Sequence, residues 1–368
     1  MCGAVRRYSW VMEDSTAVAI PLYDRPSWPD LLKRLIDKRP LSFGEAYAAM
    51  ADMLAGETAN EVAAAFLTAL RCKGESPEEM TGMASAMADY ATPVPWDGDL
   101  IDTCGTGGDQ KHSVNISTMA ALVVAASGKK VCKHGNRASS SKSGSADVLE
   151  YLGVRVDLGP AGVRACIEQV NMGFALATRF HRSMAHVGAV RRSLGVPTAF
   201  NFLGPLVNPA RANRQLVGVF EARMARTLAE VLAQLGTEHA MVAYSADGFD
   251  ELSTTSSNSV IELRRSADGG AIFEEYTLDA RDYHIARAVP ADLEGGDPQH
   301  NGESLRAVFA GKKGPVRDVA VLNAGAALYL ADAAPDIATG IELAGELIDS
   351  GRAARSLTEL VEVSNSLA

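Results

Sequence analysis

DTCGTGGDQKHSVNIST, residues 102–118, joins an apolar stretch typical of a strand to one typical of a helix. Gly105, Gly107 and Gly108 leave the backbone bare in this turn, so amide N–H groups can converge on an anion at the start of the helix. The spacing matches neither the dinucleotide motif GxGxxG nor the P-loop motif GxxxxGK followed by Ser or Thr. A tight turn without any ligand explains the glycines equally well. Asp109 would repel a bare phosphate, so we expect it to face sugar hydroxyls or a metal-bound diphosphate.

The alternation of strand and helix continues on both sides of this turn. LIDT and KKVCKHG predict strands, and ISTMAALVVAASG between them predicts a helix. SADVLEYLG and GPAGVRACIEQV predict helices on either side of a strand VRVDL. RMARTLAEVLAQLG predicts a helix before the strand AMVAYS, VIELRRSADGGAIFEEYTL predicts a hairpin, and RDVAVLNAGAALYLA opens a final helical region. This order predicts an α/β fold with a mainly parallel central sheet.

The segment before the turn, residues 27–92, predicts four short helices joined by tight turns. Three pairs are spaced as capping boxes at helix starts: Ser42 with Glu45, Thr58 with Glu61, and Ser76 with Glu79. Residues 1–25 have no clear period and predict a loosely attached extension. TPVPWDGD marks a boundary, so we expect an extension at 1–26, a helical bundle domain at 27–95 and an α/β domain from residue 96.

Composition disfavours several classes of protein. The chain has 368 residues, a net charge of −10 and no basic stripe, which disfavours nucleic acid as a partner. Its five cysteines are scattered without a CxxC pair, so we expect no disulfide framework and no zinc site, and a reducing cytoplasm is favoured. Glu13 and Asp14 interrupt the apolar N-terminus, which makes a poor signal peptide. We expect no membrane association, because no apolar run approaches the roughly 20 residues of a membrane span.

A second polar loop, KHGNRASSSKSGSAD, residues 133–147, also follows a predicted strand and precedes a predicted helix. It offers cations and hydroxyls from Lys133, Arg137, Lys142, Ser139 to Ser141, Ser143 and Ser145. One basic, serine-rich loop is usually only solvated. Two such loops after successive strands lie at the carboxyl edge of one sheet, where open α/β folds bind ligands. Together they predict a site for a polyanion.

Two further stretches contain candidate functional residues. DGFDELS, residues 247–253, follows the predicted strand AMVAYS and places Asp247, Asp250 and Glu251 together. Such a turn is usually surface, but beside two phosphate loops its oxygens favour Mg²⁺. In RFHRSMAHVGAVRRSLG, residues 179–195, a predicted helix over 183–195 aligns Arg191 with an apolar face, which suits a substrate carboxylate. Pairing of this arginine with surface acids is the alternative.

Five stretches, in this order and spacing, resemble the anthranilate phosphoribosyltransferases of the tryptophan pathway: GTGGD, NIST, KHGNRASSSKSGSAD, VGAVRRSLGVPTAFNFLGPLVNP and DGFDELS. The resemblance covers roughly residues 28–350. It implies the fold of the pyrimidine nucleoside phosphorylases, in which a small helical domain that also includes about residues 184–210 is hinged to an α/β domain of residues 96–183 and 211–368. It also implies a homodimer and two small-molecule substrates, phosphoribosyl diphosphate (PRPP) and anthranilate.

The resemblance also implies roles for matching positions. It assigns PRPP to Gly105, Thr106, Gly107, Gly108, Asp109, Asn115, Ser117, Thr118, Lys133 and Ser145. It assigns anthranilate to Gly105, His134, Asn136, His181, Met184 and Arg191, with Arg191 on the carboxylate. Magnesium, about two ions with PRPP, would be contacted by Ser117, Asp250 and Glu251. Asp109, Lys133 and His134 are the catalytic candidates it implies.

The implied reaction gives N-(5-phosphoribosyl)anthranilate and diphosphate, the second step from chorismate to tryptophan. C1 of the ribose becomes oxocarbenium-like as the diphosphate departs, and the amine attacks from the opposite face and inverts that centre. An aryl amine needs no deprotonation before attack, so the reaction does not require a base; base catalysis by His134 is left open but is not needed.

The chain departs from the family pattern at one place. Where the family has His-Pro-x-x-Arg/Lys-His/Asn, this chain has His181, Arg182, Ser183, Met184, Ala185 and His186. These positions flank the acceptor side, so the sequence leaves open an acceptor other than anthranilate. A nucleoside phosphorylase is disfavoured because its KxSTGGxGD-like loop is absent from the sequence. A nucleic-acid-binding relative is disfavoured because the PRPP motifs are intact and the net charge is negative.

Overall fold

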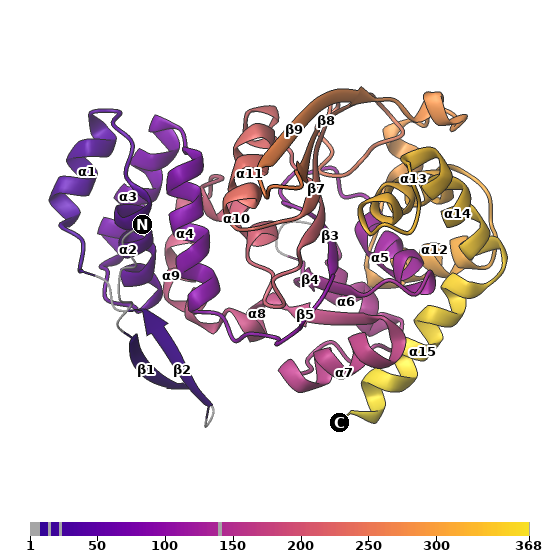
Figure 1. Cartoon of the computed structure of the whole chain (residues 1–368), viewed down its shortest axis with the longest axis horizontal. Helices are drawn as coiled ribbons and strands as arrows, with labels where there is room; N and C mark the ends of the chain where they lie inside the picture. Colours follow the sequence, from indigo (N-terminus) through magenta and orange to yellow (C-terminus); the bar gives the residue numbers. More distant parts are fainter. Residues whose placement is uncertain (1–7, 14–15, 22–23, 139–141, 368) are drawn as a thin grey trace. The chain divides into compact units, whose positions relative to one another are not determined.

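The computed structural model describes residues 8–13, 16–21, 24–138 and 142–367, and the chain divides into two compact units (Figure 1). The first, here the helical unit, comprises Met1–Pro93 and Phe180–Pro209. The second, here the α/β unit, comprises Val94–Arg179 and Ala210–Ala368. No helix in the described part of the chain is long and apolar enough to cross a membrane.

The helical unit contains the four helices expected over residues 27–92. They are α1 (Trp28–Ile36), α2 (Phe43–Leu54), α3 (Asn60–Lys73) and α4 (Pro77–Asp89). The capping boxes of Ser42 with Glu45 and Ser76 with Glu79 are both confirmed. The third was wrong, because α3 is capped by Ala59, and the Thr58 hydroxyl instead donates to Asp52 Oδ2 at 2.8 Å.

Close packing of α2 on α4 forms the centre of this unit. Met50, Met53, Met80 and Met83 are at most 2% exposed, so these side chains fill the core. A Cβ on Gly82 of α4 would overlap the carbonyl oxygen of Phe43. Glycine therefore allows the two helices to approach at this point.

The remaining helices of this unit come from the middle of the chain. They are the 3₁₀ turn η1 (Arg182–Met184), α9 (Ala185–Leu194), α10 (Phe200–Leu203) and η2 (Gly204–Leu206). The helix predicted over 183–195 is confirmed as η1 and α9. The segment AFNFLGPLVNP includes α10 and η2, and Phe200, Phe202 and Leu203 in it are buried.

The interpretation of residues 1–25 as a stretch without a period was wrong for residues 8–13 and 16–21, whereas residues 1–7, 14–15 and 22–23 lie outside the described residues. β1 (Tyr8–Glu13) and β2 (Thr16–Pro21) pair antiparallel, with Tyr8 opposite Pro21 and Glu13 opposite Thr16. YSWVME and TAVAIP contain β-branched and aromatic residues and are separated by two residues. That composition and spacing are a hairpin signal.

A seven-stranded sheet forms the α/β unit, in the order β5-β4-β3-β6-β7-β8-β9. Its strands are β3 (Ile101–Gly105), β4 (Val131–Gly135), β5 (Met172–Leu176), β6 (Arg214–Gly218), β7 (His239–Ser245), β8 (Asn258–Arg265) and β9 (Ala271–Leu278). The first five strands in this order run parallel to one another, and β8 and β9 are added antiparallel. The predicted α/β fold with a mainly parallel sheet is therefore confirmed, as is the hairpin of β8 and β9.

Nine α-helices accompany this sheet in the described residues. They are α5 (Ile116–Ala126), α6 (Ser145–Tyr151), α7 (Pro160–Val170), α8 (Ala177–Phe180, whose last residue begins the helical unit), α11 (Ala222–Gln234), α12 (Pro298–Phe309), α13 (Pro315–Leu330), α14 (Ile337–Asp349) and α15 (Arg352–Ser366). α7 packs on β5, α11 packs on β7, and α5 packs with α13 and α15. The predicted final helical region is confirmed.

One predicted strand was wrong and two strands were missed. Residues 154–158 connect α6 and α7 and form no strand; Val154, Val156 and Leu158 are buried while Asp157 is exposed. The alternation of buried and exposed side chains in this segment therefore reflects its packing against the unit and no backbone pairing with a strand. The strands β5 and β6 were not predicted, because five mostly buried residues in a parallel sheet show no alternation.

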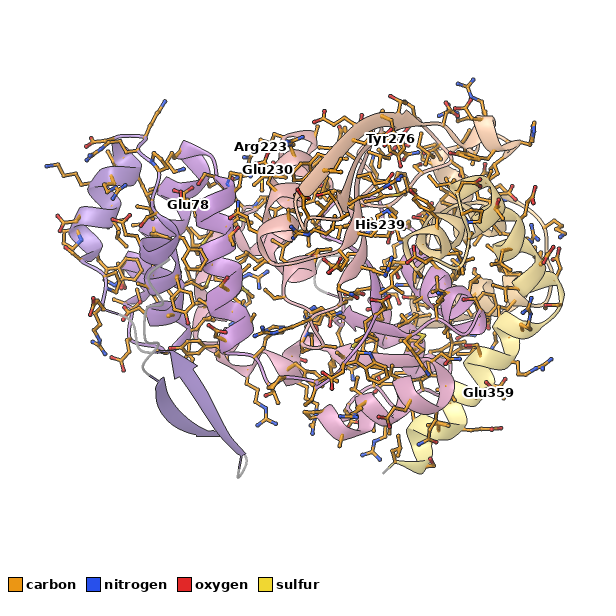
Figure 2. All side chains as sticks on the ribbon, viewed as in Figure 1. Glu78, Arg223, Glu230, His239, Tyr276 and Glu359 are labelled. Atoms are coloured by element: carbon orange, nitrogen blue, oxygen red, sulfur yellow. The ribbon has the colours of Figure 1, made fainter. Side chains whose placement is uncertain are left out.

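A buried polar network holds the antiparallel part of the sheet. Glu262 on β8 accepts hydrogen bonds from Tyr276 on β9 at 2.9 Å and from Tyr329 on α13 at 2.7 Å. His239, labelled with Tyr276 in Figure 2, places Nε2 2.8 Å from the same carboxylate. Burial alone would raise the pKa of Glu262, but the hydrogen bonds from its neighbours, His239 first among them, lower it to about 2. The network is saturated and structural.

Candidate active site

The glycine turn after β3 adopts a backbone that few residue types tolerate. Gly107 and Gly108 have φ angles of 72° and 85°, and Gln110 and His112 have φ angles of 57° and 52°. Side chains rarely adopt this left-handed region, so surrounding contacts must hold the turn. The Gly107 N–H donates to Asp250 Oδ2 at 2.5 Å. The predicted anion-binding backbone therefore meets a carboxylate from a distant loop.

That carboxylate belongs to the acidic loop, residues 246–257, which joins β7 to β8. Asp250 is 8% exposed and Glu251 is 9% exposed. A Cβ on Gly105 would overlap the Asp250 carboxylate, and one on Gly218 would overlap the Asp250 backbone. Two strand ends without side chains therefore allow the acidic pair to lie against the glycine turn. Gly218, which the sequence analysis missed, also accepts a hydrogen bond from the Thr106 N–H at 2.9 Å.

Three carboxyl groups lie close enough to perturb one another. Burial, then the negative charges of Asp109 and Glu251, raise the pKa of Asp250 well above its usual range. Burial raises the pKa of Glu251 to about 7, although the charge of Lys133 and hydrogen bonds from Ser117 oppose that rise. A divalent cation would relieve this repulsion, and carboxylate and hydroxyl oxygens are suitable ligands for Mg²⁺.

The protein oxygens do not complete a metal site by themselves. Across the described residues, no group of three or more His, Cys, Asp or Glu side chains is arranged to hold a metal ion. The predicted set of Ser117, Asp250 and Glu251 therefore fits Mg²⁺ only if a substrate supplies further oxygens, which is the usual behaviour of Mg²⁺ at phosphate sites.

Lys133 connects three of the predicted motifs. Its side chain, from β4, is buried, and Nζ donates to the Thr103 carbonyl at 2.6 Å and to Ser117 Oγ at 3.2 Å. Ser117, on the first turn of α5, in turn forms a hydrogen bond with Glu251. The structure thus brings Lys133, Ser117, Asp109, Asp250 and Glu251 to one edge of the sheet.

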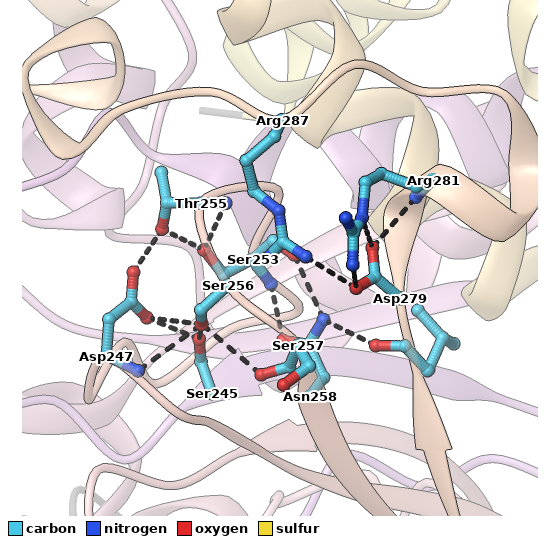
Figure 3. Close-up of polar contacts among 11 residues, drawn as sticks. Ser245, Asp247, Ser253, Thr255, Ser256, Ser257, Asn258, Asp279, Arg281 and Arg287 are labelled. Carbon is cyan, nitrogen blue, oxygen red and sulfur yellow. Dashed lines mark hydrogen bonds and ion pairs between the residues drawn. The ribbon is translucent and has the colours of Figure 1, made fainter.

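Hydrogen bonds fix the acidic loop on both sides of the pair (Figure 3). Asp247 accepts hydrogen bonds from the hydroxyls of Ser245, Thr255 and Ser256, which lower its pKa against the effect of burial. Its carboxylate is therefore used in holding the loop. The sequence grouped Asp247 with the metal candidates, and the structure separates it from them.

Two buried asparagines bind the backbone just after the pair. The Asn323 side chain, from α13, accepts the Leu252 N–H at 3.1 Å and donates to the Leu252 carbonyl at 2.7 Å. The Asn258 side chain pairs with Ser253 in the same way, at 2.8 and 3.0 Å. Both asparagines are fully buried. Sequence reasoning missed both, because neither an asparagine inside an apolar helix nor one at the start of a strand has a pattern that indicates its partner.

The second polar loop differs from its prediction. Arg137 pairs with Glu150 at 2.6 Å and with Asp147 at 3.2 Å, and Lys142 lies 3.5 Å from Glu294. These two cations are therefore engaged by acids, which leaves Lys133 as the buried cation of this loop. Ser139, Ser140 and Ser141 lie outside the described residues.

The other predicted residues of this loop lie at the same end of β4. Ser145 Oγ donates to the Asn136 carbonyl at 3.4 Å, and Asn136 itself is exposed. His134 is buried, with its backbone N–H 3.2 Å from Asp102 Oδ1. Gly135 between them has no room for a Cβ, which would overlap Ser145 Oγ.

Asn115 and Thr118 flank Ser117 at the start of α5. Asn115 is the N-cap residue, but its side chain makes no capping bond and is therefore not used in closing the helix end. Thr118 is fully buried, and its hydroxyl has no hydrogen-bond partner among the described residues.

Three of the predicted acceptor residues belong to the helical unit. His181 is buried, with Nε2 3.0 Å from the Val207 carbonyl oxygen. Burial lowers the pKa of His181 to about 4, so it is neutral at pH 7. Met184 ends η1, and the Arg191 guanidinium on α9 lies 5.3 Å from the centre of the Phe200 ring.

Comparisons with known proteins give the same result as the motifs. Residues 97–354 match the glycosyl transferase family a/b domain, and residues 29–91 match the helical bundle domain of that family. An anthranilate phosphoribosyltransferase from Salinispora arenicola is 46% identical over 350 residues, covering 93% of this chain and 98% of the relative.

Two solved structures extend this likeness to the fold. The anthranilate phosphoribosyltransferase of Thermus thermophilus superposes with a TM-score of 0.85 at 41% identity, covering 91% of this chain and 99% of that one. The Saccharomyces cerevisiae protein in complex with PRPP and Mg superposes with a TM-score of 0.84 at 27% identity, covering 92% and 98%. The resemblance seen in the motifs is confirmed, and the chain belongs to the anthranilate phosphoribosyltransferase family.

Proposed function

We propose that this protein transfers the phosphoribosyl group of PRPP to the amine of anthranilate. The products are N-(5-phosphoribosyl)anthranilate and diphosphate, on the pathway to tryptophan. The observation that carries the proposal is the burial of Asp250 and Glu251 against the glycine turn, beside Lys133 and Ser117. That arrangement suits a metal-bound diphosphate joined to a sugar.

PRPP binds at the carboxyl edge of the sheet in this proposal. The bare backbone of the glycine turn lies against the diphosphate, Asp109 accepts from ribose hydroxyls, and Lys133 balances negative charge. The full set is Gly105, Thr106, Gly107, Gly108, Asp109, Asn115, Ser117, Thr118, Lys133 and Ser145. Magnesium, about two ions, would be held through Ser117, Asp250 and Glu251 together with phosphate oxygens.

In this proposal the reaction is promoted by positive charges placed beside the departing diphosphate. Mg²⁺ bound with PRPP would stabilise the negative charge that builds on the departing diphosphate. Lys133 adds a positive charge from the protein, and Asp109 orients the ribose so that C1 faces the amine. The aryl amine is a neutral nucleophile and loses its proton after attack, so the reaction requires no base before C–N bond formation.

The acceptor side is assigned to Gly105, His134, Asn136, His181, Met184 and Arg191. Arg191 would bind the anthranilate carboxylate, since a guanidinium and a carboxylate form a paired, charge-assisted contact. His181 is neutral and bonded to backbone, so in this proposal it holds the local chain and contacts the acceptor as an uncharged ring.

A fluorescence assay of anthranilate consumption tests the proposal. Purified protein with PRPP and Mg²⁺ should consume anthranilate, EDTA should stop the reaction, and added Mg²⁺ should restore it. A parallel panel of substituted anthranilates and other aryl amines tests whether Arg182 and Ala185 shift the acceptor. Turnover that is indifferent to chelation would contradict the metal assignment, and preference for another amine would replace anthranilate as the acceptor.

We also propose that the protein is a cytoplasmic homodimer that works without nucleic acid or membrane. The acidic net charge of −10 and the scattered cysteines support this environment. Sedimentation at micromolar concentration should give twice the mass of one chain, and a single-chain mass would contradict the dimer.

A further inference from the structure

A segment far along the chain holds the loop that follows the glycine turn. Residues 293–301, here called the strap, run from η4 (Pro290–Leu293) into the first turns of α12. The Gly295 N–H donates to the His112 carbonyl at 2.7 Å, and the Val114 N–H donates to the Leu293 carbonyl at 3.1 Å. A Cβ on Gly295 would lie 2.5 Å from the Ser113 carbonyl oxygen, so glycine permits this contact.

Asn301 extends the strap to a residue assigned to PRPP. It is 3% exposed, and its Oδ1 accepts the Gly296 N–H at 2.8 Å. Its Nδ2 donates to Asn115 Oδ1, also at 2.8 Å. The Asn115 Nδ2 then donates to the Ser143 carbonyl at 3.4 Å. The chain of bonds therefore joins the strap, the glycine-turn loop and the second polar loop.

Backbone groups at both ends fix the direction of this chain. A backbone N–H at Gly296 can only donate, so Asn301 must present its oxygen there and its NH₂ to Asn115. Asn115 must then present its oxygen to Asn301, and the Ser143 carbonyl accepts from its NH₂. One N–H of the Asn115 amide is used by neither contact. Rotating this amide by half a turn would replace that donor with a carbonyl oxygen, which repels an anion.

We propose that Asn301 is a positioning residue that keeps an N–H of Asn115 directed at the oxygens of PRPP. This inference rests on the proposed function, because Asn115 is assigned to PRPP there. Asn301 does not touch the substrate in this proposal. Its effect on PRPP passes through the orientation of the Asn115 amide, so it depends on that side chain being present.

A double-mutant cycle of Asn301→Asp and Asn115→Ala tests this dependence. In Asn301→Asp the new carboxylate would still accept the Gly296 N–H but would no longer donate to Asn115. We expect Asn301→Asp to raise the KM and the calorimetric Kd for PRPP about tenfold, with the KM for anthranilate unchanged, as for loss of one charge-assisted bond. In the Asn115→Ala background the same change should have little further effect.

Gln299→Glu is the matched control, because it makes the same amide-to-acid change on an exposed position of α12. Its own amide donates to Glu303 at 2.9 Å, away from Asn115, so it should leave PRPP binding unchanged and separates a general amide-to-acid change on α12 from loss of the bond to Asn115. If Asn301→Asp does not fold, Asn301→Ala enters the cycle in its place. Equal effects of the Asn301 substitution in both backgrounds, or no effect on PRPP, would overturn the inference. Wild-type protein that does not consume anthranilate with PRPP would instead contradict the proposed function.

Discussion

Glu251 shows how burial sets the protonation of a proposed metal ligand. Its folded-state pKa of about 7 lies above the ordinary value of 4.5, so the folded protein holds a proton that the unfolded chain releases. The contribution to folding is present below about pH 4.5 and is lost as pH rises through about 7. Proton loss is also what frees the carboxylate for a cation, so stability and metal binding depend oppositely on pH here.

We therefore predict that the metal-free protein loses about 3 kcal/mol of unfolding free energy between pH 4.5 and 7 from this group. Glu251→Gln removes the titration, so its unfolding free energy should fall less over the same range. Urea unfolding in EDTA at several pH values measures the difference between the two proteins. Parallel curves for wild type and variant would show that Glu251 titrates at its ordinary value.

Lys133 and Asp109 are predicted to be essential for turnover. Asp109→Ala removes the carboxylate assigned to the ribose, and Lys133→Ala removes the buried charge beside Ser117. The kcat/KM of each variant should fall at least about a thousandfold, as expected for loss of a charge-stabilising group. The circular dichroism spectrum of each variant should remain that of the folded wild type.

Lys130 supplies the control for Lys133. It lies just before the same strand, where Nζ donates to Asn171 Oδ1 at 2.8 Å, away from the carboxyl end. Lys130→Met should keep kcat/KM within about threefold, since it changes only a local contact. A near-normal kcat/KM in Asp109→Ala or Lys133→Ala would remove the PRPP assignment.

The types of residue that follow the predicted strands were enough to group part of this site from the sequence. Lys133, Ser117, Asp250 and Glu251 could be grouped because successive parallel strands end at one edge. Gly218 and Asn323 could not be grouped with them. A single glycine at the end of an unrecognised strand, and one asparagine within a helix, have significance only once the distant acidic loop is placed against them.

At the scale of elements, the loop from β7 to β8 is held at its base and after its acidic pair. The Asp247 carboxylate accepts hydrogen bonds from hydroxyl groups near the strand ends. The side chains of Asn258 and Asn323 bind the backbone of Ser253 and Leu252, respectively. An unpaired buried backbone group costs as much as the bond it lacks. The asparagines therefore both stabilise the loop and fix where Glu251 lies.

We predict that Asn323→Ala lowers the unfolding free energy by about 3 kcal/mol, because the Leu252 N–H and carbonyl lose their partner. It should also raise the Mg²⁺ concentration needed for half-maximal turnover. Ser364→Ala in α15 is the control, since Ser364 is fully buried and accepts the Arg155 N–H at 3.0 Å, and it should lower stability without changing the Mg²⁺ response. An unchanged Mg²⁺ response in Asn323→Ala would mean that the asparagine serves stability alone.

Elements were predicted well where their local signal was strong. Capped helices such as α2 and α4 were found by Ser42 and Ser76, and the β8–β9 hairpin by Asp268-Gly269-Gly270. β5 and β6 were missed because parallel strands covered on both faces lack alternation. Val154–Leu158 was assigned to a strand because its burial alternates, but backbone pairing depends on a neighbouring strand that local sequence does not specify.

At the scale of the whole molecule, the proposed substrate residues are divided between two compact units. The PRPP set lies in the α/β unit, whereas His181, Met184 and Arg191 lie in the helical unit. We predict that Arg191→Ala raises the KM for anthranilate at least about tenfold and changes that for PRPP much less, because a charge-assisted pair to the carboxylate is lost.

Arg192→Ala is the companion variant, since the next residue on α9 is also exposed and has no assigned role. It should leave both KM values near those of the wild type. Steady-state kinetics with each substrate varied in turn distinguishes the cases. Equal increases for the two substrates in Arg191→Ala would argue against a contact with the acceptor.

The bare strand ends at Gly105 and Gly218 have a genetic consequence. Every missense codon that a single base change can make from glycine adds at least a Cβ, and neither position has room for one beside Asp250. In a tryptophan auxotroph lacking its own enzyme, alleles altered at either codon should fail to restore growth on minimal medium. Gly44 of α2 has no assigned role and no atom within 4 Å of an added Cβ, so a saturation library at that codon should retain many alleles.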